Sequence, residues 1–180
     1  MSHKWEFEDE YLRLDSEFRK ARKEGDEVIM QRVKPRLDEL NGIRWQSKVI
    51  GFPELAPYST LVEALEKLCL KNRLPFPDLS DRKKNFTGKG NLQDFGRFLF
   101  GVGNTKRSIQ IWPMEDRGYI SIEVYDDETC YKGKSKSIEE AAIVLSRWYT
   151  QECSIEELHQ QFPWMPVEPF RLIGPRVTYK

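Results

Sequence analysis

Histidine is scarce in this chain, although it is the residue that most often serves as a general base near neutral pH. The 180-residue sequence contains only His3 and His159. His159 follows Cys153 within one short segment, which suggests a nucleophile and its base, but a spacing of six residues does not favour a hydrogen-bonded pair. We therefore predict a protein without enzymatic activity. Carboxylates that converge from separate segments are the alternative that would allow catalysis.

Metal and cofactor motifs are incomplete. The acidic run from Asp126 to Glu128 lacks the alternating ligands and the glycine of a calcium loop, and is typical of a solvated turn. Residues 87–91, TGKGN, lack the spacing of a phosphate-binding loop. Gly101 and Gly103 lack the third glycine of a dinucleotide fingerprint. The sequence predicts no metal ion and no cofactor.

A basic loop is the first candidate for binding. Residues 81–91 are polar and contain glycine, and four cations surround one aromatic ring there. They are Arg82, Lys83, Lys84 and Lys89, around Phe86. Four phosphate contacts would give weak, salt-sensitive binding. This loop supports the alternative function of a nucleic-acid or nucleotide-binding accessory protein.

An acidic, aromatic segment is the second candidate and the one we favour. Its members are Glu115, Asp116, Tyr119, Glu123, Tyr125, Asp126, Asp127 and Glu128. Negative charge would steer a basic partner, and tyrosine would supply contact area. The alternative is an ordinary antiparallel sheet with a solvated outer face. We predict that a basic protein partner docks on this segment.

The elements that must position these residues are strands followed by a helix. Residues 107–112 and 118–125 alternate apolar and polar side chains, as a half-buried strand does, and a short third run covers residues 129–132. Residues 137–150 carry a wide apolar stripe at helical spacing. We therefore expect an α+β fold, a small antiparallel sheet packed against helices.

The N-terminal part predicts a helical hairpin over residues 1–42, with a turn at Gly25 and a kink or break at Pro35. A coiled-coil dimerisation arm is the alternative, so the protein is expected to be a monomer or a dimer. Residues 43–165 form the predicted core of a single domain, and residues 166–180 form an extended tail rich in proline.

Within the core, residues 43–50 alternate and suggest a strand. Ser59 or Thr60 can cap a helix that continues to about Asn72. Residues 91–100 fit a short buried helix slightly better than a strand, and residues 154–157 have the form of a capping box.

Composition limits the class of protein. Lysine and arginine number 29, and so do the acids, which gives no global preference for nucleic acid or an anionic membrane. Charge is uneven, however: residues 58–112 contain 10 basic and 5 acidic side chains, and residues 113–168 contain 5 and 12. Three separated cysteines without a C-x-x-C pair favour a reducing compartment. With no secretory signal and no long apolar run, we expect a cytoplasmic protein.

One resemblance follows from the order of these elements. Predicted strands are followed by SIEEAAIVLSRWYTQECSIEELHQQFPWM, a capped apolar helix with a tryptophan near its end and then a short helix. Residues 108–165 thereby resemble small bacterial cytoplasmic proteins of unknown function, including immunity proteins of contact-dependent or secreted toxin systems. The resemblance implies a non-enzymatic protein that neutralises a toxin domain. It assigns no binding residue to any position.

Overall fold

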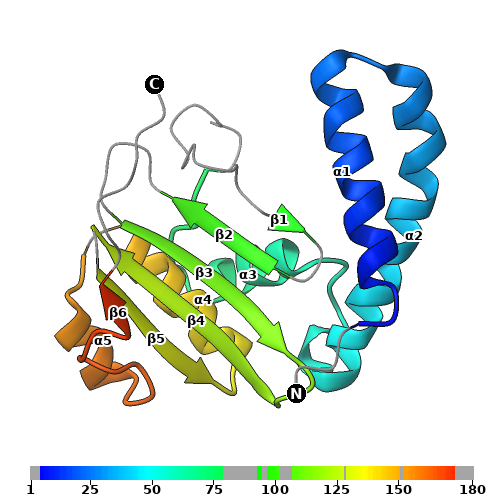
Figure 1. Cartoon of the computed structure of the whole chain (residues 1–180). Helices are drawn as coiled ribbons and strands as arrows, with labels where there is room; N and C mark the ends of the chain where they lie inside the picture. The colour runs from blue at the N-terminus through cyan, green and yellow to red at the C-terminus, as the bar shows by residue number, and fades with distance from the viewer. Residues whose placement is uncertain are drawn as a thin grey trace. The chain divides into compact units, whose positions relative to one another are not determined.

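The computed structural model describes residues 5–78, 93–94, 97–101, 107–127, 129–150 and 152–172 (Figure 1). They form an α+β structure in which an antiparallel sheet is accompanied by helices, as the sequence predicts. The chain divides into two compact units, residues 1–47 and residues 48–180. Each unit is described below by itself.

The first unit contains the predicted helical hairpin. Helix α1 (Glu8–Glu24) ends at Gly25, whose positive φ of 72° suits a residue without a Cβ atom. Asp26 then accepts a hydrogen bond from the amide of Ile29 at 3.1 Å, which fixes the start of helix α2 (Glu27–Gly51). A buried seam holds the two helices together. It comprises Leu14, Val33, Leu37 and Leu40, with Trp5, Phe7, Tyr11, Phe18 and Ile29 packed against it.

Helix α2 is longer than predicted. It continues through Pro35 and ends only at Gly51, inside the second unit. Of the kink or break predicted at Pro35, the break is therefore wrong, and so is the predicted strand over residues 43–50. Leu37, Leu40 and Trp45 are buried along this helix at spacings of three and five residues. An alternating run of eight residues can also lie on a helix, and burial of the seam offsets the cost of proline in its interior.

The second unit is built on a sheet whose strands follow one another in chain order. The strands are β1 (Gln93–Asp94), β2 (Arg97–Gly101), β3 (Arg107–Met114), β4 (Tyr119–Asp126), β5 (Thr129–Ser135) and β6 (Arg171–Leu172). Every neighbouring pair is antiparallel. The three predicted strands are confirmed as β3, β4 and β5, and the sheet continues beyond them on both sides.

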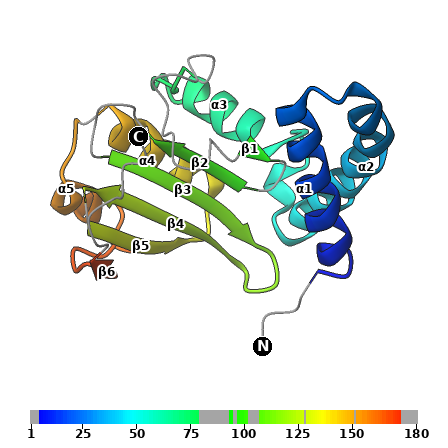
Figure 2. The same ribbon diagram turned by 45° about the horizontal axis from the view of Figure 1, so that its top comes forward.

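Helices α3 (Leu61–Lys71) and α4 (Ile138–Tyr149) cover one face of this sheet (Figures 1 and 2). Both were predicted, and their N-caps are Thr60 and Ser137, whose hydroxyl oxygens accept hydrogen bonds from amides of the first turn. A short 3-10 helix, η1 (Pro53–Leu55), precedes α3. Helix α5 (Ile155–Gln161) begins with the predicted capping box of Ser154 and Glu157.

The core of the second unit lies between the sheet and these helices. Alternate residues of β3 and β4 are fully buried there: Ile109, Ile111, Ile120, Ile122 and Val124. The stripe of α4 packs on them, and each such side chain contributes roughly 1.5–3 kcal/mol by leaving water. One face of the sheet is therefore buried in the core.

One further predicted segment has a different structure, and two others lie at least partly outside the described residues. The predicted helix over residues 91–100 is wrong: residues 93–94 form strand β1, and residues 97–100 belong to strand β2, which pairs with β3 over four positions. A short apolar run is compatible with either structure until its partner is known. The basic loop of residues 81–91 lies outside the described residues, as do residues 173–180 of the predicted tail. Across the described ranges, no helix is both long and apolar enough to cross a membrane.

Candidate protein-docking site

The structure distributes the predicted acidic site along strand β4. Tyr119, Glu123 and Tyr125 alternate with the buried side chains of β4 and therefore lie on the face of the sheet opposite to α4. Glu115 and Asp116 lie in the turn before β4, and Asp126 and Asp127 lie at its other end. Because a strand rises roughly 3.4 Å per residue, the two ends of this eight-residue strand are about 24 Å apart. The predicted residues therefore do not form one patch. Glu128 lies outside the described residues.

Glu115 forms an internal ion pair at the first end. The ammonium group of Lys48 lies 2.5 Å from its carboxylate and 2.6 Å from the carbonyl oxygen of Pro113. The Lys48 side chain is only 5% exposed, so its charge needs these two acceptors. Glu115 therefore compensates a buried lysine, and its charge is not available in full to a partner.

Glu123 is also paired, near the middle of β4. Lys132 of the neighbouring strand lies 3.3 Å from its carboxylate, and the hydroxyl of Tyr125 donates a hydrogen bond to it. Lys134 lies over the ring of Tyr119, 5.0 Å from its centroid. The outer face of β4 and β5 thus combines lysines and tyrosines with the carboxylate of Glu123. Lysine side chains therefore offset the predicted negative charge along these two strands.

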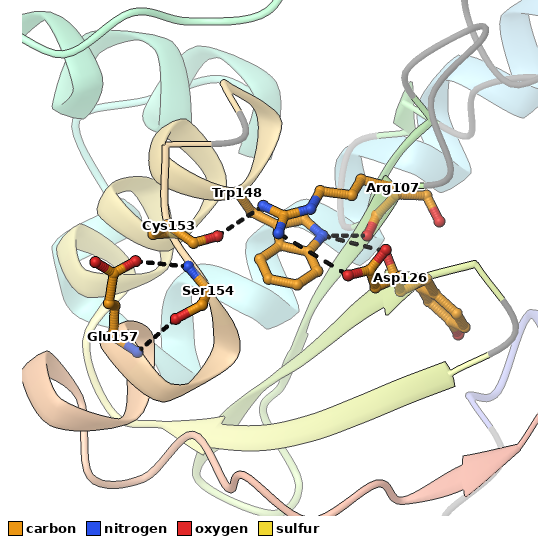
Figure 3. A network of polar contacts seen from close by, with 8 residues as sticks. Arg107, Asp126, Trp148, Cys153, Ser154 and Glu157 are labelled. Atoms are coloured by element: carbon orange, nitrogen blue, oxygen red, sulfur yellow. Dashed lines mark hydrogen bonds and ion pairs between the residues drawn. The ribbon is translucent and has the colours of Figure 1, made fainter.

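Asp126 belongs to a network that joins the strand ends to the segment between α4 and α5 (Figure 3). The guanidinium of Arg107 lies 3.9 Å from the ring centroid of Trp148 and 3.9 Å from the Asp126 carboxylate. It also donates a hydrogen bond of 2.8 Å to the carbonyl oxygen of Cys153. The indole N–H of Trp148 donates to the carbonyl oxygens of Ser108 and Tyr125. This network gives the second end of β4 a defined geometry.

Further acidic residues reach this second end from other elements. Asp127 and Glu156 are exposed, and so is Glu152 in the segment before α5. Burial raises the pKa of Tyr131, and the negative charges of Asp126 and Glu156 raise it further. We call the set of Asp126, Asp127, Tyr131, Glu152 and Glu156 the acidic end. Its carboxylates come from β4, the β4–β5 turn and the region of α5.

Sequence reasoning missed three of the five residues of the acidic end. Tyr131 lies in the third, shortest predicted strand, and Glu152 and Glu156 lie in a helical region that carries no strand signal. The capping box at residues 154–157 predicted where α5 begins but not against which element it lies. What connects them is the negative charge of Asp126 and Glu156, which raises the pKa of Tyr131.

The Cys153 and His159 pair is not arranged for catalysis. Burial raises the pKa of the Cys153 thiol, whereas an activated cysteine nucleophile has a lowered pKa. The Nδ1 atom of His159 lies 2.6 Å from the carbonyl oxygen of Met165, and the charged groups that act on the Cys153 thiol are Arg147, Arg107 and Glu157. His3 lies outside the described residues.

Metal and nucleic-acid binding receive no support from the geometry. The residues that the structure describes contain no cluster of three histidine, cysteine, aspartate or glutamate side chains that could hold a metal ion. The cations of the alternative anion site, Arg82, Lys83, Lys84 and Lys89, all lie outside the described ranges. No family model, no curated protein and no solved structure matches this chain.

Proposed function

We propose that this chain is a non-enzymatic binding protein that docks a basic protein partner on its acidic end. The observation that carries the proposal is the placement of Asp126 diagonal to the half-buried Tyr131 across the β4–β5 ladder. The negative charge of Glu156, from α5, also raises the pKa of Tyr131. Exposed Asp127 and Glu152 extend the negative surface around them. Charge of one sign beside an aromatic side chain suits recognition of a surface rich in lysine and arginine.

The division of the acidic residues determines which of them contribute. Glu115 and Glu123 already have lysine partners at 2.5 and 3.3 Å, so docking on them would require breaking internal pairs. Asp127 and Glu156 are exposed at the acidic end, where their carboxylates can be reached by a partner. The Arg107 network holds the end of β4 in place before the partner arrives, which reduces the entropy lost on binding.

The finer form of the proposal concerns the partner. Following the resemblance of residues 108–165 to immunity-type proteins, we propose that the partner is a basic toxin domain and that binding occurs in the bacterial cytoplasm. By covering the basic surface with which the toxin domain holds its own substrate, the protein would neutralise the toxin without chemistry. The resemblance supports a toxin domain as the partner, and the negative charge of the acidic end supports a positively charged partner surface.

The test measures binding of the purified protein to the product of the adjacent gene, because an immunity gene must be inherited with its toxin. Calorimetry at low and at physiological salt compares the wild type with the double variant Asp127→Lys/Glu156→Lys. Exposed ion pairs contribute roughly 0.2–1 kcal/mol each, so reversing two charges should weaken binding about tenfold at low salt. The difference should shrink as salt increases.

A matched control keeps the change in net charge the same. Asp116→Lys/Glu54→Lys alters two exposed acids away from the acidic end, in the β3–β4 turn and in η1, and should leave the affinity within about twofold. An equal loss of affinity in both double variants would mean that only net charge matters, and it would contradict the assignment of the acidic end as the docking site. A neighbouring gene product that does not bind the wild type would contradict the toxin-neutralising form.

A further inference from the structure

Strand β5 has an outer edge that the described chain covers only in part. Strand β6 pairs with β5 at Thr129 and Cys130 alone, and the amide of Phe170 adds one hydrogen bond to the Cys130 carbonyl oxygen at 2.8 Å. No other described strand lies beside residues 131–135 on that side. More than half of β5 therefore lacks a neighbouring strand at its outer edge within the described ranges.

The direction of the backbone groups on this edge follows from the Cys130 contact. Along a strand, the N–H and C=O groups of one residue point to the same edge, and successive residues alternate between edges. Because the Cys130 carbonyl faces outwards, the backbone groups of Lys132 and Lys134 face outwards as well. These two residues offer two donors and two acceptors to an added strand.

Prolines explain why the protein's own chain does not continue along this edge. The segment that leads into β6 contains Pro166 and Pro169, which have no N–H to donate to a ladder. In its antiparallel register, β6 runs from the level of Cys130 towards the β4–β5 turn, away from residues 131–135. Strand β6 thus begins only beyond the open edge of β5.

The side chains on this edge are strongly basic on one face. Lys132 and Lys134 lie on the outer face of the sheet, and the exposed Lys136 follows the strand. Phe170, 58% exposed, lies with its ring centroid 5.1 Å from the Lys132 ammonium group. On the other face, Gly133 has no side chain, and the indole of Trp164 covers it so closely that an added Cβ atom would lie 2.8 Å from the ring. One face is therefore cationic and the other presents an aromatic surface.

We infer that the outer edge of β5 binds an extended acidic segment of a partner protein, which pairs with residues 131–135 as an added strand. Acidic side chains of that segment face Lys134 and also Lys132, whose ammonium group lies 3.3 Å from Glu123. Lys134 is therefore the main charged contact, and the intervening apolar side chains lie near Trp164. Main-chain hydrogen bonds supply affinity, and the alternating pattern of acidic and apolar residues supplies specificity. This edge adjoins the acidic end at Tyr131, but it binds a ligand of the opposite charge.

Charge decides between the possible occupants. Lysines on an edge strand hinder pairing with a second copy of the same edge, since like charges would then face each other. The chain's own undescribed stretches suit the edge no better: residues 79–92 contain four basic side chains and one acidic one, and residues 173–180 contain two basic and none acidic. An acidic segment from another protein is the occupant that the lysines favour.

The test uses a fluorescein-labelled heptapeptide of alternating glutamate and valine, with fluorescence anisotropy as the readout. Saturable binding to the full chain is expected, together with slowed amide exchange at Lys132 and Lys134. A peptide with lysine in place of glutamate should not bind. Lys134→Glu should weaken binding about fivefold to tenfold, whereas Lys20→Glu, at an exposed position of the first unit, should leave it within about twofold.

Two changes address the main-chain bonds themselves. Lys134→Pro removes one outward N–H without removing a bond of the β4–β5 ladder, so it should abolish binding while the fold persists. Should that variant not fold, peptides N-methylated on alternate amides provide the same test. Methylation of the amides that face β5 should abolish binding, and methylation of the opposite set should not.

Several outcomes would overturn the inference. They are the absence of saturable binding to the wild type, equal affinity of the two N-methylated peptides, and equal losses in Lys134→Glu and Lys20→Glu. Concentration-dependent dimerisation that Lys134→Pro abolishes would assign the edge to a second copy instead. Asp127→Lys/Glu156→Lys should bind the peptide with an affinity within about twofold of the wild type, which separates this edge from the acidic end.

Discussion

Arg107 is the residue whose removal should most clearly damage the acidic end. Its guanidinium is held by three contacts: the Cys153 carbonyl at 2.8 Å, the Trp148 ring at 3.9 Å and the Asp126 carboxylate at 3.9 Å. A charged hydrogen bond contributes about 1.5–3 kcal/mol, and cation–π stacking about 0.5–2 kcal/mol. The pair with Asp126 adds less than about 1 kcal/mol, because that carboxylate is 47% exposed.

We therefore expect Arg107→Ala to lower the free energy of unfolding of the second unit by about 3 kcal/mol. With a urea m-value of about 1.5–2 kcal/mol/M, the midpoint of unfolding should fall by roughly 1.5–2 M. Arg107→Lys keeps the charge but loses the planar stack and the fork of donors, so its midpoint should fall by about 0.5–1 M. Tryptophan fluorescence follows both transitions, since Trp112, Trp148 and Trp164 belong to this unit.

Arg147 provides the control for Arg107. It lies on α4, and its guanidinium donates to the side chain of Gln161 at an exposed site. Arg147→Ala should change the free energy of unfolding by less than about 0.5 kcal/mol. If Arg107→Ala stayed within that range, or if Arg107→Lys matched the wild type, the network would not stabilise this end of the sheet as described.

Three further predictions concern other parts of the second unit. Gly133→Ala should lower the free energy of unfolding by about 2–4 kcal/mol, because the new methyl group would overlap the Trp164 ring. Urea denaturation measures this loss, and an unchanged midpoint would contradict the tight contact. Glu115→Ala should cost about 3 kcal/mol and Lys48→Met less, since only the first leaves a buried charge unpaired; the reverse order in urea would disprove this. Hydrogen bonds from Lys67 and Ser59 lower the pKa of Glu63 to about 2. The contribution of this carboxylate to folding stability should therefore be complete above pH 4.5 and disappear as the pH falls towards 2. The difference in Tm between the wild type and Glu63→Gln should narrow over that range, and a constant difference would refute the role of these hydrogen bonds.

Sequence signals predicted a helix or strand correctly where the whole signal lies within that element. The hydroxyl caps Thr60, Ser137 and Ser154 begin helices where expected, because each satisfies amides within its own turn. The alternation in β3 and β4 likewise reports a buried face directly. These elements needed no knowledge of the rest of the chain.

Predictions failed where a partner decides the outcome. Residues 97–101 became a strand because β3 lies beside them, and residues 43–50 continued a helix whose preceding turns are buried in the hairpin. The acidic site failed to gather into one patch for the same reason. Its residues are close in sequence, but Lys48, 67 residues before Glu115, and Lys132, on the neighbouring strand, approach two of the carboxylates. Periodicity cannot reveal which cation will lie opposite a given acid.

The order of the strands has a consequence for how the second unit acquires its structure. Each strand pairs with the strand next to it in sequence, so most of the sheet forms from contacts with small sequence separation. Proteins of low contact order close short loops and therefore fold fast. Strands β3, β4 and β5 can form successive hairpins as the chain leaves the ribosome. Helix α4 follows them directly, so the apolar face of the nascent sheet is exposed only until the next fifteen or so residues have been made.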